Sequence, residues 1–329
     1  MLKKTVICIS LITAINAQAA TIYKNENGDT LKIYGEVGVG GHIGADYESG
    51  EFFEDESYID DSFATIGAKG TNDDFYYRLE LDFQRENWAY GSGDIVLDID
   101  KVFMGYMLND NHAIEYGLTD TALDDYDKFG DFTFDTTVET GEAGDQENTI
   151  KYEGSASDFK MGVSYSYDGK SSSGSALGDI INGYVGYFSK YADIVVGAET
   201  RLGSDGESKY GDQTLYTLGL RAYITDSFTI GLNGFIENED IGNDAVTSGT
   251  FTDYETTENK GALISARYKV TSKVELTASA NYEEYEGSEE DKWGTLGISY
   301  KPSRSVVVAL EGNVGDAAQD AYLYSRVYF

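Results

Sequence analysis

The chain has 329 residues, of which 58 are acidic and 24 basic, giving a formal net charge of −34. Such an excess of carboxylates repels phosphate groups, so the composition argues against nucleic acid as a partner. The 27 tyrosines, 15 phenylalanines and 38 glycines beside a single proline argue against an acidic disordered chain.

The first twenty residues have the composition of a secretory signal peptide. Two lysines precede an apolar run that ends at Ile15, and an A-x-A site that ends at Ala19 follows. This pattern predicts export and cleavage after Ala19 or Ala20. Residues 1–19 are therefore the predicted signal, and residues 20–329 are the predicted mature domain.

Apolar and polar side chains alternate from residue 31 onward, which is typical of strands with one apolar and one polar face. In residues 75–88 the apolar positions alternate with Arg78, Glu80 and Asp82. The alternation does not assign the faces of residues 95–108. Sixteen such segments follow one another, at about 31–47, 59–70, 75–88, 95–108, 113–122, 148–157, 159–168, 179–190, 191–202, 213–225, 228–240, 256–271, 273–287, 290–303, 305–316 and 318–329.

Short turns and long acidic loops alternate between these segments. Residues 71–74 and 226–227 are short turns, whereas residues 48–58 and 203–212 are long and rich in Gly, Ser or acidic residues. An even number of strands with this alternation predicts an all-β fold, a 16-stranded antiparallel up-and-down transmembrane β-barrel. A soluble sandwich would bury the charged face in a dry core, whereas a barrel of this size leaves that face in a wet lumen.

The connector at residues 123–147 is acidic, shows no strand or helix periodicity, and has Lys128 as its single base. Asp125 and Asp127 match two positions of an EF-hand loop, but Thr136 stands where the bidentate carboxylate is needed. An EF-hand is therefore not expected. Loosely bound Ca²⁺ or Mg²⁺ at the acidic loops is left open, because so many carboxylates attract counter-ions, and no other cofactor is expected.

Residues for catalysis are scarce. The histidines His42 and His112 lie in unrelated segments, and the single cysteine, Cys8, lies in the predicted signal. No spacing typical of a zinc site or a catalytic triad is present, so an enzyme is not expected. A barrel that acts through its outer loops as an adhesin or a hydrolase is the alternative from a different class.

Four stretches make the chain similar to the trimeric general porins of Gram-negative outer membranes. They are residues 20–37, the IGAKG sequence at 66–70, the YGLTD sequence at 116–120 and the C-terminal VYF at 327–329. The resemblance implies a homotrimer in the outer membrane, in contact with lipid and lipopolysaccharide. It also implies that small hydrophilic solutes and ions pass through the lumen, and that the third long loop folds inward to narrow it.

The resemblance also assigns the residues of the pore. The family's basic wall positions fall at or near Glu36, Thr65, Asp100 and Asp145, and none of these is basic. Together with the inward-folded loop this predicts a negatively charged, cation-selective constriction. The loop residues predicted at the constriction are Asp124, Asp125, Asp127, Lys128, Asp131 and Asp135. The wall residues predicted beside them are Glu36, Thr65, Lys69, Arg78, Glu80, Asp82, Asp100 and Asp145.

A substrate-selective porin, for example for oligosaccharides, is the alternative within transport. It would need aromatic side chains along the lumen. Trp88 and Trp293 lie near strand ends, where the aromatic girdle of a membrane barrel is also expected. We interpret both as girdle residues, which favours the diffusion channel.

Overall fold

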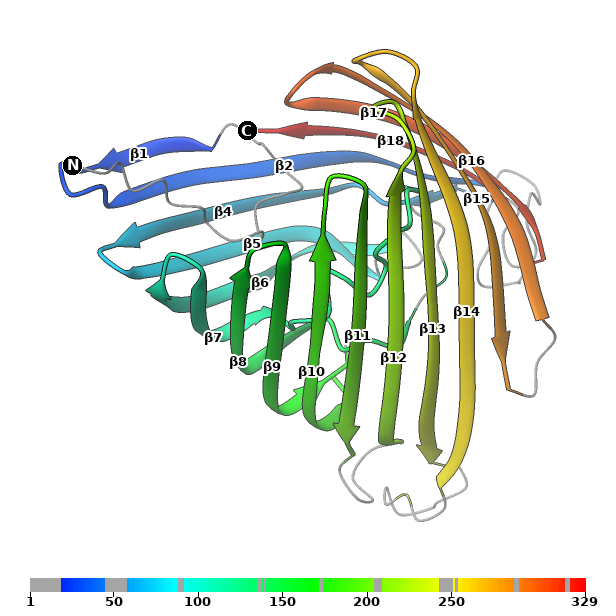
Figure 1. Cartoon of the computed structure of the whole chain (residues 1–329), viewed down its shortest axis with the longest axis horizontal. Helices are drawn as coiled ribbons and strands as arrows, with labels where there is room; N and C mark the ends of the chain where they lie inside the picture. The colour runs from blue at the N-terminus through cyan, green and yellow to red at the C-terminus, as the bar shows by residue number, and fades with distance from the viewer. Residues whose placement is uncertain are drawn as a thin grey trace.

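The computed structural model describes residues 19–44, 58–87, 92–134, 138, 140–171, 174–203, 209–242, 251, 254–286, 290–316 and 320–329. These residues form antiparallel strands joined by turns and loops (Figure 1). Among them, no helix is long and apolar enough to cross a bilayer. The predicted signal peptide lies outside the described residues, apart from Ala19.

The strands run along the chain without an intervening helix in the described residues. They are β1 (Ala20–Lys24), β2 (Thr30–Ile43), β3 (Tyr58–Asp60), β4 (Phe63–Asn72), β5 (Phe75–Asn87), β6 (Ser92–Asn109), β7 (His112–Asp120), β8 (Asp145–Ala156), β9 (Phe159–Lys170), β10 (Ala176–Phe188), β11 (Ala192–Leu202), β12 (Tyr210–Tyr223), β13 (Phe228–Gly242), β14 (Tyr254–Lys269), β15 (Val274–Tyr285), β16 (Glu290–Ser303), β17 (Val306–Gly315) and β18 (Ala321–Tyr328).

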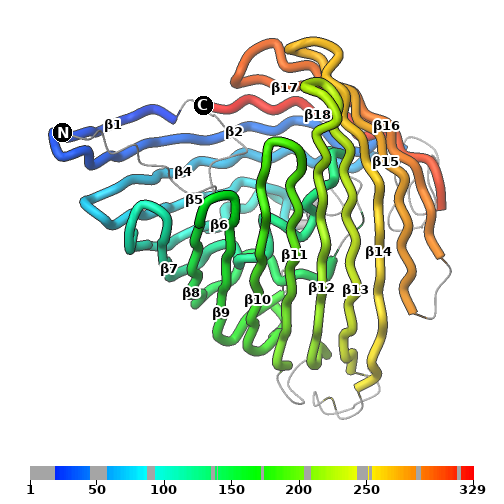
Figure 2. The backbone as a smooth tube through the Cα atoms, viewed as in Figure 1, coloured from blue at the N-terminus to red at the C-terminus, as the bar shows by residue number. Residues whose placement is uncertain are grey.

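The strands close into a ring. From β4 to β18 each strand pairs with the next, and β18 lies beside β2 (Figure 2). In the pairing of β18 with β2, Val327 lies opposite Val37. The short β1 continues the row of β18 along β2, and the short β3 continues the row of β4. The eighteen strands of the described residues therefore make sixteen rows, which confirms the predicted barrel.

The two faces of each strand differ as the alternation predicts. On β5, Leu79 is 43% exposed and lies on the outer face, whereas Glu80 is 7% exposed on the inner face. Large apolar side chains on the outside suit lipid, and polar side chains on the inside suit water. Because the ring has no free edge, the strands also satisfy one another's backbone N–H and C=O groups.

The ring is completed where the first long strand, β2, meets the C-terminal residue, Phe329. The backbone N–H of Phe329 donates to the carbonyl oxygen of Gly35 at 2.9 Å, and the N–H of Gly35 donates back to Phe329 at 3.0 Å. A Cβ atom at Gly35 would lie 2.4 Å from the carbonyl oxygen of Thr65 and 2.6 Å from the ring of Phe329. Glycine at this position therefore lets the terminal aromatic ring pack onto β2.

We expect Gly35→Ala to lower the free energy of unfolding by about 1–3 kcal/mol, because overpacking a tight site forces neighbouring atoms to move. The measurement is a urea titration of the folded barrel, with the mobility of unheated samples in a detergent gel as a second readout. Gly312→Ala is the matched control, because nothing lies within 4 Å of a Cβ atom there. Equal destabilisation by both substitutions would contradict this account.

Candidate functional site

The acidic connector between β7 and β8 lies inside the barrel, as the resemblance implies. Its apolar side chains turn toward the wall, where Leu123 and Phe129 join a buried cluster with Tyr184 of β10 and Leu215 of β12. Leu123 is fully buried and Phe129 is 5% exposed. We call the described residues 121–134, 138 and 140–144 the inner loop.

Two glycines in the wall let the backbone of the inner loop approach. A Cβ atom at Gly219 of β12 would lie 2.2 Å from the carbonyl oxygen of Phe129. At Gly231 of β13 it would lie 1.7 Å from the carbonyl oxygen of Gly130. Gly130 itself has a φ of +106°, which L side chains rarely adopt. The deepest contact of the loop therefore depends on three residues without side chains.

Polar side chains of the wall bind the loop backbone along its course. Asn182 accepts from the N–H of Ala122 at 3.1 Å. Asn233 donates to the carbonyl oxygen of Asp127 at 2.8 Å, and Glu311 accepts from the N–H of Phe134 at 2.8 Å. On the return, the N–H of Gly141 donates to Glu237 and that of Ala143 to Glu199, at 3.0 and 3.2 Å. The loop backbone is thus hydrogen-bonded to side chains of wall strands from β10 to β17.

A lysine that the sequence analysis missed lies where the loop leaves the wall. Lys101 of β6 is 6% exposed, and its Nζ is 2.7 Å from Asp120 and 3.3 Å from Asp100, and it also binds Asp145. The sequence predicts that the wall carries no base at or near Asp100. This prediction is wrong by one position, because the base is the next residue, Lys101. The cause is a register shift between β5 and β6, where Lys101 lies opposite Glu80 but Ile99 lies opposite Leu81.

Burial and neighbouring carboxylates raise the pKa values of two acids of the inner loop. Burial, with the charges of Asp120 and Asp127, raises the pKa of Asp124 to about 7. Burial and the charges of Glu199 and Asp124 hold the pKa of Glu142 well above its usual range. The charge of the inner loop therefore changes with pH close to neutrality.

The predicted loop residues differ in exposure. Asp125 and Lys128 are exposed, and Asp124 is half-buried. The expectation that Asp127 projects into the lumen is wrong, because it is 8% exposed and accepts hydrogen bonds from the hydroxyl of Thr140 and the N–H of Lys128.

Asp131 is half-buried and accepts two hydrogen bonds from Thr133, through its N–H at 2.9 Å and its hydroxyl at 2.7 Å. The remaining predicted loop residue, Asp135, lies outside the described residues.

The predicted wall residues of β2, β4 and β5 lie together on the inner face. Arg78 donates to Glu80 at 2.7 Å and to the hydroxyl of Tyr34 at 2.7 Å, and Tyr34 also binds Glu80. The Nζ of Lys69 is 4.5 Å from the ring of Tyr34. These contacts make one polar cluster in which Arg78 is already paired.

Glu36 and Thr65 extend this inner face. Thr65 is 9% exposed and hydrogen-bonds with Asp82. Glu36 is half-buried within electrostatic reach of Arg326 on β18, so that a base missed by the sequence analysis lies beside this predicted acidic position.

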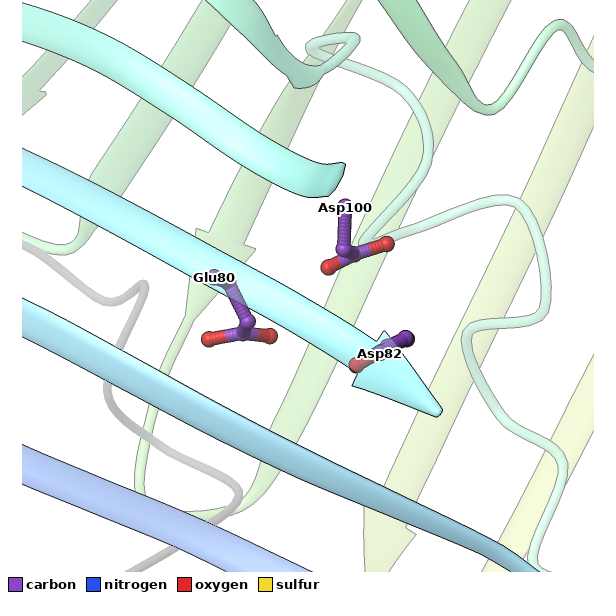
Figure 3. Close-up of side chains that lie close together, drawn as sticks. All are labelled: Glu80, Asp82 and Asp100. Carbon is purple, nitrogen blue, oxygen red and sulfur yellow. The ribbon is translucent and has the colours of Figure 1, made fainter. Parts of the chain in front are cut away.

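Three carboxylates from β5 and β6 come close together in Figure 3. Ligand oxygens of Glu80, Asp82 and Asp100 lie within 4.8 Å of one another. Those of Asp120, Asp124 and Asp145 do the same. Both groups have the oxygen donors that Ca²⁺ and Mg²⁺ prefer. The sequence leaves open a loosely bound divalent cation at the outer acidic loops, and binding of this cation stays a prediction.

A cavity of about 720 Å³ lies between the returning part of the inner loop and the wall. Nine Asp or Glu side chains line it, among them Asp98, Glu147 and Glu239, but only two bases, Lys170 and Arg201. Lys170 at the end of β9 and Tyr210 at the start of β12 line it, so it lies toward the strand ends that carry the long loops, which face the outside in barrels of this kind. We call it the acidic cavity.

The girdle interpretation is wrong for Trp293. Its side chain is 5% exposed and belongs to the cluster that packs the inner loop, on the inner face of β16 beside Asn281. A fully packed ring offers no surface to a passing sugar. Trp293 is therefore not one of the lumen-lining aromatic side chains that a substrate-selective porin would need. Trp88 lies outside the described residues.

A closed antiparallel ring with an apolar outside, a polar lumen and a loop packed inside it defines a channel of the outer membrane. The family model for Gram-negative porins matches residues 5–319. The chain belongs to this family, and it is a multi-pass protein of the outer membrane.

Solved structures of outer-membrane proteins share this fold at low sequence identity. OmpF of Salmonella typhi, in complex with daunomycin, superposes with a TM-score of 0.72 at 15% identity, over 94% of this chain and 100% of that chain. A loop-deletion mutant of OmpT from Vibrio cholerae gives 0.69 at 17%, over 92% and 99%. The anion-selective porin of Comamonas acidovorans gives 0.63 at 13%, over 92% and 100%. None of the curated proteins matches the sequence.

We expect Lys101→Gln to raise the ratio of cation to anion permeability about twofold, because one positive charge is removed from the lumen and the salt of the recording solution screens much of its effect. The substitution leaves Asp120 and Asp145 without their shared cation. The measurement is the reversal potential in a KCl gradient. Lys273→Gln in an exposed short turn is the control, and a ratio equally changed in both variants would refute a role for Lys101 in the lumen.

Proposed function

We propose that the chain forms a water-filled, non-catalytic channel through which small hydrophilic solutes and ions diffuse passively, with a preference for cations. The observation that carries this proposal is the acidic cavity, where nine carboxylates face two bases. Both bases are already paired, because the Nε of Arg201 lies 2.9 Å from Glu199 and the Nζ of Lys170 lies 3.9 Å from Glu147. Uncompensated carboxylates in a narrow lumen raise the local concentration of cations and lower that of anions.

Lys101 moderates this field without reversing it. Three carboxylates share its ammonium group, so the cluster of Asp100, Asp120, Asp145 and Lys101 carries more negative than positive charge when its acids are ionised. The fold alone does not determine the sign of selectivity, because an anion-selective porin has the same fold. The charged side chains of this particular lumen therefore carry the proposal.

A homotrimer is part of the proposal. One of the similar structures is a trimer form of OmpT. A barrel with large apolar side chains over its whole outer face can bury part of that face against a second copy. Crosslinking of the purified, unheated protein reports the number of subunits, and a monomer at all concentrations would refute this part.

The reversal potential of the purified oligomer in a KCl gradient tests selectivity. We expect a cation-selective channel, because chloride has to pass the acidic cavity. An anion-selective or unselective channel would contradict the proposal. A protein that folds but does not conduct would instead favour the loop-based adhesin or hydrolase.

Cation selectivity should increase as the pH rises from about 6 to 8. The pKa of Asp124 is raised to about 7, so its carboxyl group is mainly neutral below this value and mainly charged above it. One more negative charge then faces the ion path at the higher pH. Reversal potentials at both pH values measure the change, and the Asp124→Asn variant should show a clearly smaller one. An unchanged pH response in that variant would exclude Asp124 as its source.

A further inference from the structure

Two arginines lie against aromatic side chains of the inner loop, on the face opposite to the acidic cavity. The guanidinium carbon of Arg221 on β12 is 4.0 Å from the ring centroid of Phe129 and 5.6 Å from that of Phe132. That of Arg267 on β14 is 4.5 Å from the ring of Phe132. Both arginines lie against the ring of Phe132, so their guanidinium carbons lie within about 10 Å of each other. We call these residues the arginine pair.

The arginine pair keeps hydrogen-bond donors that no described residue accepts from. Both Nε atoms are buried without a hydrogen-bond partner in the described part of the chain. A guanidinium carries five N–H donors, and contact with an aromatic face takes up none of them. Both side chains are only half-buried, so other donors of each group keep access to the lumen.

The nearby acids do not neutralise the arginine pair. No carboxylate of the described residues lies within 4 Å of a nitrogen of Arg221. Asp193 is 8% exposed and accepts hydrogen bonds from the hydroxyl of Tyr223 and the N–H of Ser189. Glu275 is 3.9 Å from Arg267 and also 3.9 Å from Lys301. One carboxylate thus serves two bases, and a net positive charge remains.

The arginine pair lies near the periplasmic end of the barrel. Arg221 is two residues from the end of β12, and Arg267 is two residues from the end of β14. Short turns follow both strands, and short turns face the periplasm in outer-membrane barrels. The acidic cavity opens toward the other end, beside residues such as Lys170 and Tyr210. The inner loop therefore has a cationic face on its periplasmic side and an anionic face on its outer side.

We propose that the arginine pair binds a polyvalent oxyanion, a polycarboxylate or a polyphosphate, that enters the lumen from the periplasm. The proposal rests on the proposed channel function. Two guanidiniums held by aromatic rings are pre-organised to bridge two oxyanion groups of one molecule. The acidic cavity above repels this anion, so it stays beneath the loop and blocks the ion path. The block therefore depends on the side from which the anion arrives.

Single-channel recording in planar bilayers tests the proposal, with potassium citrate or potassium pyrophosphate added to one side at a time. The current in KCl before addition tests the channel itself. We expect citrate and pyrophosphate to interrupt the current at much lower concentration from the periplasmic side. In Arg221→Gln/Arg267→Gln the half-blocking concentration should rise about tenfold or more, because each charged contact is lost. The better blocker of the two shows whether carboxylate or phosphate is preferred.

Arg304→Gln is the matched control, since Arg304 is an exposed residue of a short periplasmic turn and its substitution removes the same charge. Its half-blocking concentration should stay within a factor of about two of the unmodified channel. A displaced loop would change the current before any anion is added. If the glutamine variant shows such a change, Arg221→Lys/Arg267→Lys is tested in its place. This variant keeps both charges, and the block should weaken because the planar donors are lost.

Three results would overturn the proposal. They are an equal block in the glutamine variant and the unmodified channel, an equal block from both sides, and the absence of block by either anion in a conducting channel. A channel that does not conduct in KCl contradicts the proposed function instead, so the two failures are distinguishable.

Discussion

A bilayer offers no partner for an unpaired N–H or C=O group, and this constraint determines the rest of the molecule. The strands satisfy it by closing into a ring, in which β18 pairs with β2. Successive side chains of a strand point to opposite faces, so in a closed ring with an apolar, lipid-facing outside the intervening residues form the inside. In this chain those residues are largely polar or charged, and the lumen is wet. The inner loop then decides how wide and how charged the ion path is.

The inner loop joins packing and electrostatics in one segment. Its apolar side chains and the glycines of β12 and β13 fix it to one wall, and polar wall residues such as Asn233 and Glu237 satisfy its backbone. Its carboxylates Asp124 and Asp125 lie within electrostatic reach of Lys101, whereas its aromatic rings on the opposite side cover Arg221 and Arg267. Charge of opposite sign therefore lies on its two faces, along the axis of the barrel.

The fold could be predicted from the sequence because side-chain alternation reports directly which face of a strand meets lipid. Residues such as Leu79 and Glu80 were assigned correctly on this basis. The site could be predicted only in part, because its details depend on features that do not alter composition. One register shift turns Lys101 inward, hydrogen bonds within the loop turn Asp127 away from the lumen, and packing against the loop buries Trp293. The periodicity of the sequence contains none of this information.

The contact between Gly35 and Phe329 has a consequence for biogenesis. The two residues lie 294 positions apart in the sequence, so the cylinder is sealed only when both of these distant segments are in place. Until then the unpaired margin of β2 is open to self-association. Closure therefore does more than complete the barrel, because it removes the edge at which a second chain could add a strand.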